Sequence, residues 1–80
     1  MKSVNVRYFA LFRELAGKET ESIKVDCATY ADLYRELSAR YQFILPIDTI
    51  QVAVNDEFIH ADQPLIDNAS VVFIPPVAGG

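Results

Sequence analysis

Residues 29–41 read Thr29-Tyr30-Ala31-Asp32-Leu33-Tyr34-Arg35-Glu36-Leu37-Ser38-Ala39-Arg40-Tyr41. Apolar and aromatic side chains recur at positions 30, 33, 34, 37 and 41, which is the spacing of one buried face of an α-helix. Thr29 is a typical N-cap, and Asp32 three residues later makes a short variant of the capping box. We therefore predict one amphipathic helix over residues 30–41 whose aromatic stripe packs against a core.

Strand patterns lie on both sides of this helix. Before it, residues 3–9 alternate, with Val4, Val6 and Tyr8 on one face, and residues 21–25 alternate again. After it, residues 50–54 and 58–60 read as two strands around a turn at residues 55–57. The last stretch, residues 70–74, is apolar on both faces, which indicates a central position in a sheet.

A second, shorter helix is expected between the first two strands. It covers Ala10–Ala16, with Leu11, Phe12 and Leu15 as its apolar residues, and Gly17 follows in the position that ends many helices. The predicted order is strand, short helix, strand, long helix and three strands.

One long helix must then cover one face of a mixed sheet. The fold class we predict is α+β, a ubiquitin-like β-grasp domain over residues 1–74 with a sheet of four or five strands and a flexible, extended tail over residues 75–80. The alternative is a ferredoxin-like sandwich. That fold needs a second full-length helix near the C-terminus, where residues 61–68 are too few and contain Pro64.

Composition narrows the classes of partner. The chain has 80 residues, 51% of them hydrophobic, with a net charge of -4, so it has the make-up of a globular domain with an acidic surface. Nucleic acids and anionic membranes select basic surfaces, and we therefore expect neither as a partner. A single cysteine, Cys27, allows no internal disulfide, which fits a reducing cytoplasm.

The body of the domain offers no recognisable active site. No two glycines lie close together before the terminus, so a glycine-rich phosphate loop is not possible and we expect no bound cofactor. His60 is the only histidine, and we expect no metal site. We expect His60 to be a solvated loop residue and Cys27 to be a small buried hydrophobe.

The chemically distinctive group is the C-terminal carboxylate of Gly80. Glycines at 79 and 80 leave this carboxylate unhindered, and the six residues from Pro75 to Gly80 reach at most about 20 Å when extended. A carboxylate is a poor electrophile until it is activated, commonly as an acyl-adenylate. A partner enzyme must supply that step with ATP, after which the acyl group passes to sulfur or to an amine.

Two stretches carry a resemblance to a known family. They are Val6-Arg7-Tyr8-Phe9-Ala10-Leu11-Phe12-Arg13-Glu14-Leu15-Ala16-Gly17 and Phe73-Ile74-Pro75-Pro76-Val77-Ala78-Gly79-Gly80. Together with Val52-Ala53-Val54-Asn55 and Asp62-Gln63-Pro64-Leu65, they resemble the small subunits of molybdopterin synthase, which are ubiquitin-like sulfur carriers. The likeness covers essentially the whole chain. The Gly-Gly end alone is shared with the sulfur carrier of the thiamin pathway and with ubiquitin-like modifiers.

The resemblance implies a cycle in which the chain itself is not an enzyme. An ATP-dependent activating enzyme adenylates Gly80, a sulfur donor protein helps convert it to a thiocarboxylate, and the chain docks on a large catalytic subunit, usually in a heterotetramer. There the sulfur passes to a cyclic pyranopterin monophosphate. The family implies that Gly79 and Gly80 form the reacting end and that residues 75–78, Pro75-Pro76-Val77-Ala78, contact the partner.

A docking face can also be sought on the sheet. Phe9 lies on the polar side of the first strand, Phe58 follows a turn, and the last strand has more apolar residues than one buried face needs. Either Val72 and Ile74 or Val71 and Phe73 must therefore face outward. In the family, the positions that match Phe9, Phe58 and Ile74 form an apolar patch of the kind that marks an interaction site.

Three other functions stay open at this point. The chain would fit a sulfur carrier for thiamin or another sulfur-containing product, a protein modifier conjugated to lysines, or a binding module whose tail is inert. The sequence does not distinguish these alternatives, because they differ in the fate of the activated terminus.

Overall fold

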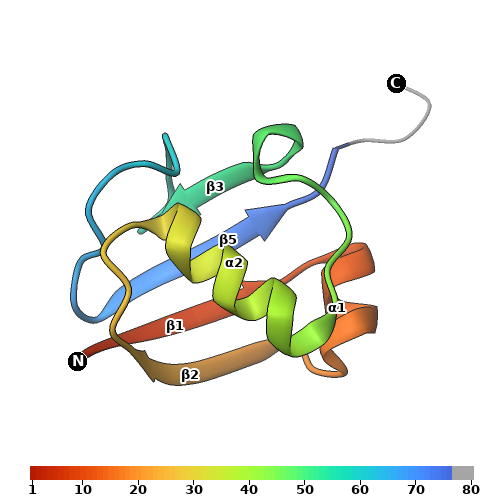
Figure 1. Ribbon diagram of the computed structural model, residues 1–80, viewed down its shortest axis with the longest axis horizontal. Coiled ribbons are helices and arrows are strands. Elements are labelled where there is room, and N and C mark those ends of the chain that lie inside the picture. The colour runs from red at the N-terminus through yellow and green to blue at the C-terminus, as the bar shows by residue number, and fades with distance from the viewer. Residues whose placement is uncertain (77–80) are drawn as a thin grey trace.

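The computed structural model describes residues 1–76, and Figure 1 shows one twisted sheet with the long helix lying across it. Its elements in chain order are β1 (Lys2–Tyr8), α1 (Ala10–Ala16), β2 (Thr20–Val25), α2 (Tyr30–Tyr41), the one-turn 3₁₀ helix η1 (Ile47–Thr49), β3 (Gln51–Val54), β4 (Glu57–Ile59) and β5 (Ala69–Ile74). This is the predicted order of strands and helices, with η1 as an addition.

The sheet has five strands in the order β2-β1-β5-β3-β4. β5 is central, as its apolar sequence predicts, and pairs with β1 in parallel and with β3 antiparallel. The terminal strands of the chain are therefore neighbours, with Val6 beside Val71 and Tyr8 beside Phe73. A mixed sheet covered by one main helix is the predicted β-grasp arrangement.

The core lies between α2 and one face of the sheet. Alternate residues of each strand point into it, among them Val6 and Tyr8 of β1 and Val71 and Phe73 of β5, all at most 1% exposed. From α2, the stripe predicted by helical spacing is buried at Tyr30, Leu33, Tyr34 and Leu37. The sequence left open which residues of β5 face away from the core. They are Val72 and Ile74, which are half-buried.

Local signals account for the ends of the elements. The backbone N–H of Asp32 donates to Thr29 Oγ1 at 3.1 Å, so Thr29 caps α2 as predicted. Gly17 ends α1 with a left-handed φ of 74°, which glycine adopts without strain. Asn55 and Asp56 both have positive φ, at 51° and 70°, which is the two-residue turn that joins twisted strands in a hairpin.

The structure corrects three details of the sequence interpretation. Leu15 is 38% exposed, and Ala16 takes the buried position of α1 in its place. Glu57 belongs to β4 rather than to the turn, and β4 ends at Ile59, before His60. Ile50 ends η1 rather than beginning β3. Each difference is a shift at the end of an element, where helical and strand periodicity carries little information.

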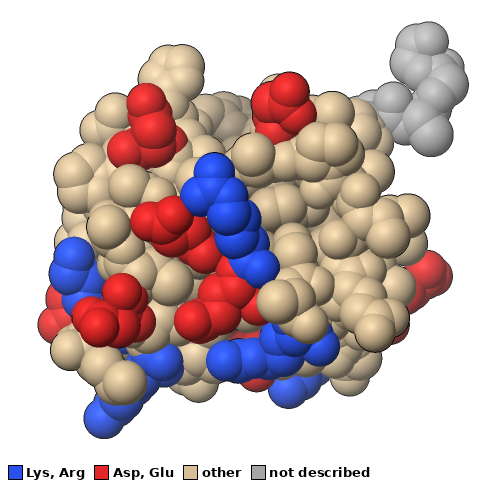
Figure 2. All heavy atoms as spheres, viewed as in Figure 1, with Lys and Arg blue, Asp and Glu red and all other residues tan. Residues whose placement is uncertain are grey.

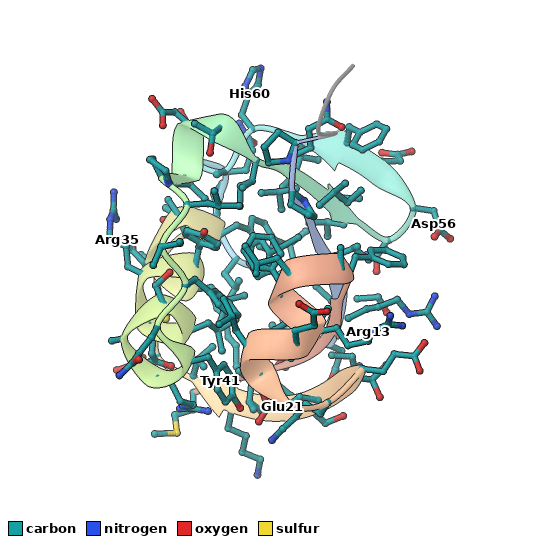
Figure 3. The ribbon with its side chains drawn as sticks, turned by 90° about the vertical axis from the view of Figure 1, so that its right-hand side faces the viewer. Arg13, Glu21, Arg35, Tyr41, Asp56 and His60 are labelled. Carbon is teal, nitrogen blue, oxygen red and sulfur yellow. The ribbon has the colours of Figure 1, made fainter. Side chains whose placement is uncertain are left out.

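A cluster of polar side chains ties the C-terminal end of α2 to β2. The Glu21 carboxylate, 14% exposed, accepts hydrogen bonds from the hydroxyls of Tyr8 and Tyr41, each at 2.7 Å, and from Lys18 Nζ at 3.1 Å. Figure 3 shows Glu21 and Tyr41 side by side at this end of the molecule. Burial acts to raise the pKa of Glu21, but the bonds from Tyr41, Tyr8 and Lys18 outweigh it and hold the pKa below its usual range.

We expect Glu21→Gln to lower the free energy of unfolding at pH 7 by about 1.5–3 kcal/mol, the range for hydrogen bonds to a charged group. Because the pKa is lower in the folded state, this stabilisation is complete above the unfolded value of about 4.3 and is lost as the pH falls through the folded value. Urea denaturation of both proteins at several pH values should show their difference shrinking in acid. A difference that stays constant with pH would contradict this role, and Glu19→Gln, at an exposed position, is the control.

Candidate docking face

The face of the sheet opposite α2 has no helix over it in the described part of the chain, residues 1–76. We call it the open face. Strand register places its side chains in rows, one of which runs from Phe58 through Ala53 and Val72 to Arg7. The next row holds Gln51 beside Ile74. Residues far apart in the sequence therefore meet on one surface.

The three residues predicted to form an apolar patch all lie on this open face. Phe58 is 70% exposed and Phe9 is 42% exposed, while Ile74 is half-buried. Phe58 lies on β4 and Ile74 on β5, and these two strands are about 10 Å apart because β3 lies between them. Ala53 of β3 and Val72 of β5 fill the space between the two side chains. The structure thus brings Phe9, Phe58 and Ile74 together as the rim of a continuous apolar surface, the apolar patch.

Short-range structure holds the two aromatic side chains outward. The Asn55-Asp56 turn fixes the register of β4 on β3, which places Phe58 on the side opposite the core. At the other edge, Ala10 adopts a positive φ of 48° directly after Phe9, and the Phe9 carbonyl accepts the backbone N–H of Phe12 at 2.9 Å. The chain turns from β1 into α1 at this point. Because the backbone of Phe9 is still extended, its side chain points to the face of the sheet opposite the buried side chain of Tyr8.

The rest of the open face is polar. A shallow depression of about 420 Å³ is lined by Arg7, Asn55 and Ser70, among others, beside Val72. Arg7 lies next to Val72 in the parallel pairing of β1 and β5. The apolar patch therefore ends at this polar depression, toward the end of the sheet away from the tail.

The tail begins at the edge of this surface. β5 ends at Ile74, whose backbone pairs with Gln51, and Pro75 and Pro76 follow outside the strand, half-buried and exposed respectively. The remaining site residues predicted from the sequence, Val77, Ala78, Gly79 and Gly80, lie outside the described residues. The tail therefore begins beside the apolar patch, directly after the end of β5.

Two reactive side chains lie elsewhere. Cys27 is half-buried between β2 and α2, and burial, followed by the charges of Glu36, Asp32 and Asp26, raises the pKa of its thiol. His60 is exposed after β4, as predicted, and Figure 3 shows it at the η1 end of the molecule. Neither residue belongs to the apolar patch.

Sequence reasoning missed Ala53 and left Val72 as one of two alternatives for this surface. Both sit in short apolar runs in which alternate residues look equally suited to the core. Only the pairing of β3 with β5 puts them side by side between Phe58 and Ile74. Register of this kind depends on long-range contacts, which a local pattern does not contain.

A family model, described as the ThiS family, matches residues 6–80. The chain belongs to the ThiS family. The match begins within β1 and ends at Gly80, so it includes every residue of the predicted site. The ubiquitin-like β-grasp fold predicted from the sequence is confirmed by the solved structures that follow.

Two curated relatives in the family cover nearly the whole chain. The molybdopterin synthase sulfur carrier subunit of Escherichia coli is 34% identical over 80 residues, which are 96% of this chain and 99% of the relative. Small archaeal modifier protein 3 of Haloferax volcanii is 33% identical over 90 residues, 96% of this chain and 98% of the relative. The predicted resemblance to molybdopterin synthase small subunits is confirmed.

Two solved structures show the same fold. A Pyrococcus furiosus protein, assigned provisionally as molybdopterin converting factor subunit 1, superposes with a TM-score of 0.79 at 32% identity and covers 96% of this chain and 100% of its own. A complex of subunits 1 and 2 of molybdopterin-converting factor from Helicobacter pylori contains a chain that superposes with a TM-score of 0.66 at 26% identity, covering 98% of this chain and 99% of its own. That small subunit is thus known in a complex with a second protein.

Proposed function

We propose that this chain is a sulfur carrier of molybdenum cofactor biosynthesis, the small and non-catalytic subunit of a molybdopterin synthase. The observation that carries the proposal is the family match over residues 6–80, which includes the Gly-Gly end together with the strands that build the apolar patch. The curated Escherichia coli relative with the name of a sulfur carrier subunit supports it further.

The proposed chemistry takes place at the carboxylate of Gly80. A partner enzyme transfers the adenylyl group of ATP to this carboxylate and releases pyrophosphate, which makes the acyl carbon electrophilic. The outer sulfur of a persulfide on a donor protein then displaces AMP and forms an acyl disulfide, and a thiol reduces this disulfide to release the thiocarboxylate. Because the carboxyl group accepts and delivers the sulfur, the chain needs no cofactor of its own.

Delivery of the sulfur requires docking. We propose that the apolar patch of Phe9, Phe58 and Ile74 binds the large catalytic subunit, in a heterotetramer, while Pro75-Pro76-Val77-Ala78 guides Gly80 into its active site. The sulfur then passes to a cyclic pyranopterin monophosphate held by the large subunit. The two prolines favour an extended chain, which reduces the entropy lost when the tail enters a channel.

The experiment that tests this function is intact-mass measurement of the chain purified from a host that contains its partners. Replacement of one oxygen by sulfur at the terminus, followed by conversion of the cyclic substrate on addition of the large subunit, is the expected result. The assignment to molybdopterin would be refuted if the large subunit did not consume the thiocarboxylate and another sulfur-requiring pathway, such as that of thiamin, did.

A second candidate function, conjugation to other proteins, is favoured by the relative named as an archaeal modifier protein. A modifier passes its activated acyl group to a lysine amine and forms an isopeptide bond. The same mass measurement separates the two, since a modifier gives a ladder of conjugates.

Replacement of the lone thiol should leave sulfur loading nearly unchanged. A rival route would carry sulfur as a persulfide on Cys27, but that route needs an accessible thiolate, and burial together with three nearby carboxylates raises the pKa of this thiol. We expect Cys27→Ser to form the Gly80 thiocarboxylate at a rate within about twofold of the wild type, a difference of less than 0.5 kcal/mol. A folded Cys27→Ser protein that accepts no sulfur would place the chemistry in the body of the domain.

A further inference from the structure

We propose that a groove beside β4 is a second contact for the protein that takes up the tail, and that it receives an apolar side chain flanked by Lys or Arg. The groove has a volume of about 600 Å³ and lies between the N-terminal end of α2, η1, the start of β3 and the end of β4. It shares Gln51 and Phe58 with the open face, and the family resemblance assigns it no role. This inference rests on the proposed function, because it adds a contact with the same partner.

The floor of the groove is apolar. Ile47, Ile50, Ile59 and Ala61 line it, and all four are half-buried and packed against the core cluster. Four partly exposed apolar side chains around one concavity leave a surface that is stabilised when a further apolar group covers it. Ile47 lies in η1 and Ile59 in β4, and the backbone N–H of Ala31 donates to the carbonyl oxygen of Ala61 at 2.7 Å. These parts of the floor are therefore held in place before a partner arrives.

The rim of the groove carries charge of one sign. Asp48 lies on one side and Asp62 on the other, and none of the described residues that line the groove is Lys or Arg. Figure 2 shows acidic groups without basic ones along the upper edge of the molecule, where η1 and the segment after β4 lie, while the basic groups gather lower on the same face. An apolar hollow between two carboxylates selects a partner side chain that has cationic neighbours.

The groove lies at the end of the sheet from which the tail departs. Gln51 lines the groove and pairs directly with Ile74, the last residue of β5. Phe58 contributes both to the groove and to the apolar patch of the open face. A partner that covers the patch and takes the tail therefore meets the mouth of the groove around the edge strand β4, without any change in the fold.

Two variants test the two properties of the groove separately. Asp48→Asn/Asp62→Asn removes the charge and keeps the shape, and Ala61→Leu fills part of the hollow and keeps the charge. Asp26→Asn/Asp56→Asn is the matched control, since both residues are exposed and lie at the opposite end of the sheet. Affinity for the large catalytic subunit would be measured by calorimetry at low and high salt, with circular dichroism to verify folding.

We expect both groove variants to weaken binding about fivefold, as for the loss of a few peripheral contacts, and the control to bind within about twofold of the wild type. Binding of Asp48→Asn/Asp62→Asn should also depend less on salt. Unchanged affinity of either groove variant, while Phe9→Asp weakens binding, would overturn the inference and leave the proposed function standing. Absence of binding by the wild-type chain would overturn both.

Discussion

Removal of Gly80 is expected to lower sulfur transfer by more than about 100-fold while the domain stays folded. The reacting carboxyl group would then belong to Gly79 and would lie about 3.5 Å short of its place in the partner's active site. A misplacement of 1 Å already costs about 100-fold in a positioned reaction. Addition of one residue after Gly80 should have an effect of the same size, because it buries the carboxyl group in a peptide bond and moves the new one too far.

The fold provides the control for this experiment. The buried core residues of the described chain fall within residues 4–73, so loss of the last residue leaves all of them in place. The unfolding midpoint of the shortened protein should match that of the wild type, and affinity for the large subunit should fall far less than turnover. Full transfer activity without Gly80 would show that the terminus is not the site of sulfur attachment.

Phe58→Asp should weaken binding to the large subunit by about 30-fold, which corresponds to about 2 kcal/mol for an exposed aromatic anchor. The side chain is 70% exposed, so its replacement disturbs no core packing, and a carboxylate in an apolar interface adds a cost of desolvation. Phe9→Asp, at 42% exposed, should give a similar loss. Ile74→Asp affects a half-buried residue and should also lower stability.

Ser70→Asp is the matched control for these variants. Ser70 is exposed on the same face of β5, at the end away from the tail, and the substitution adds the same charge. It should bind the large subunit nearly as well as the wild type. Circular dichroism distinguishes a lost interface from a lost fold. Equal affinities for Phe58→Asp and Ser70→Asp would place the docking surface elsewhere.

Sequence alone predicted most of the fold because its two strongest patterns agree. The 3.6-residue stripe from Tyr30 to Tyr41 and the two-residue alternation around Val6 each specify a buried face, and together they require a helix on a sheet. The inner face of α1 was misjudged at Leu15 because seven residues make only about two turns, too few to show which stripe is buried.

The site was predicted only in part for a different reason. Phe9 and Phe58 stand out because Phe9 breaks the local pattern and Phe58 follows a turn, and Ile74 was predicted from the family resemblance. Ala53 gave no such signal, and Val72 stayed one of two alternatives. The groove beside β4 had no sequence signal at all, since its walls come from three separate stretches of the sequence. Surfaces of this kind depend on register and on loop placement, which long-range contacts decide.

The central place of β5 has a mechanical consequence for the proposed entry of the tail into a partner. A pull directed along β5 is resisted on both sides, because the strand is bonded to β1 on one side and to β3 on the other. Backbone hydrogen bonds cross the direction of that pull, so they bear the load together instead of opening one after another. In the proposed cycle, a partner would therefore pull on the terminus and release it without separating the strands of the sheet. The same chain would then be ready to carry another sulfur atom.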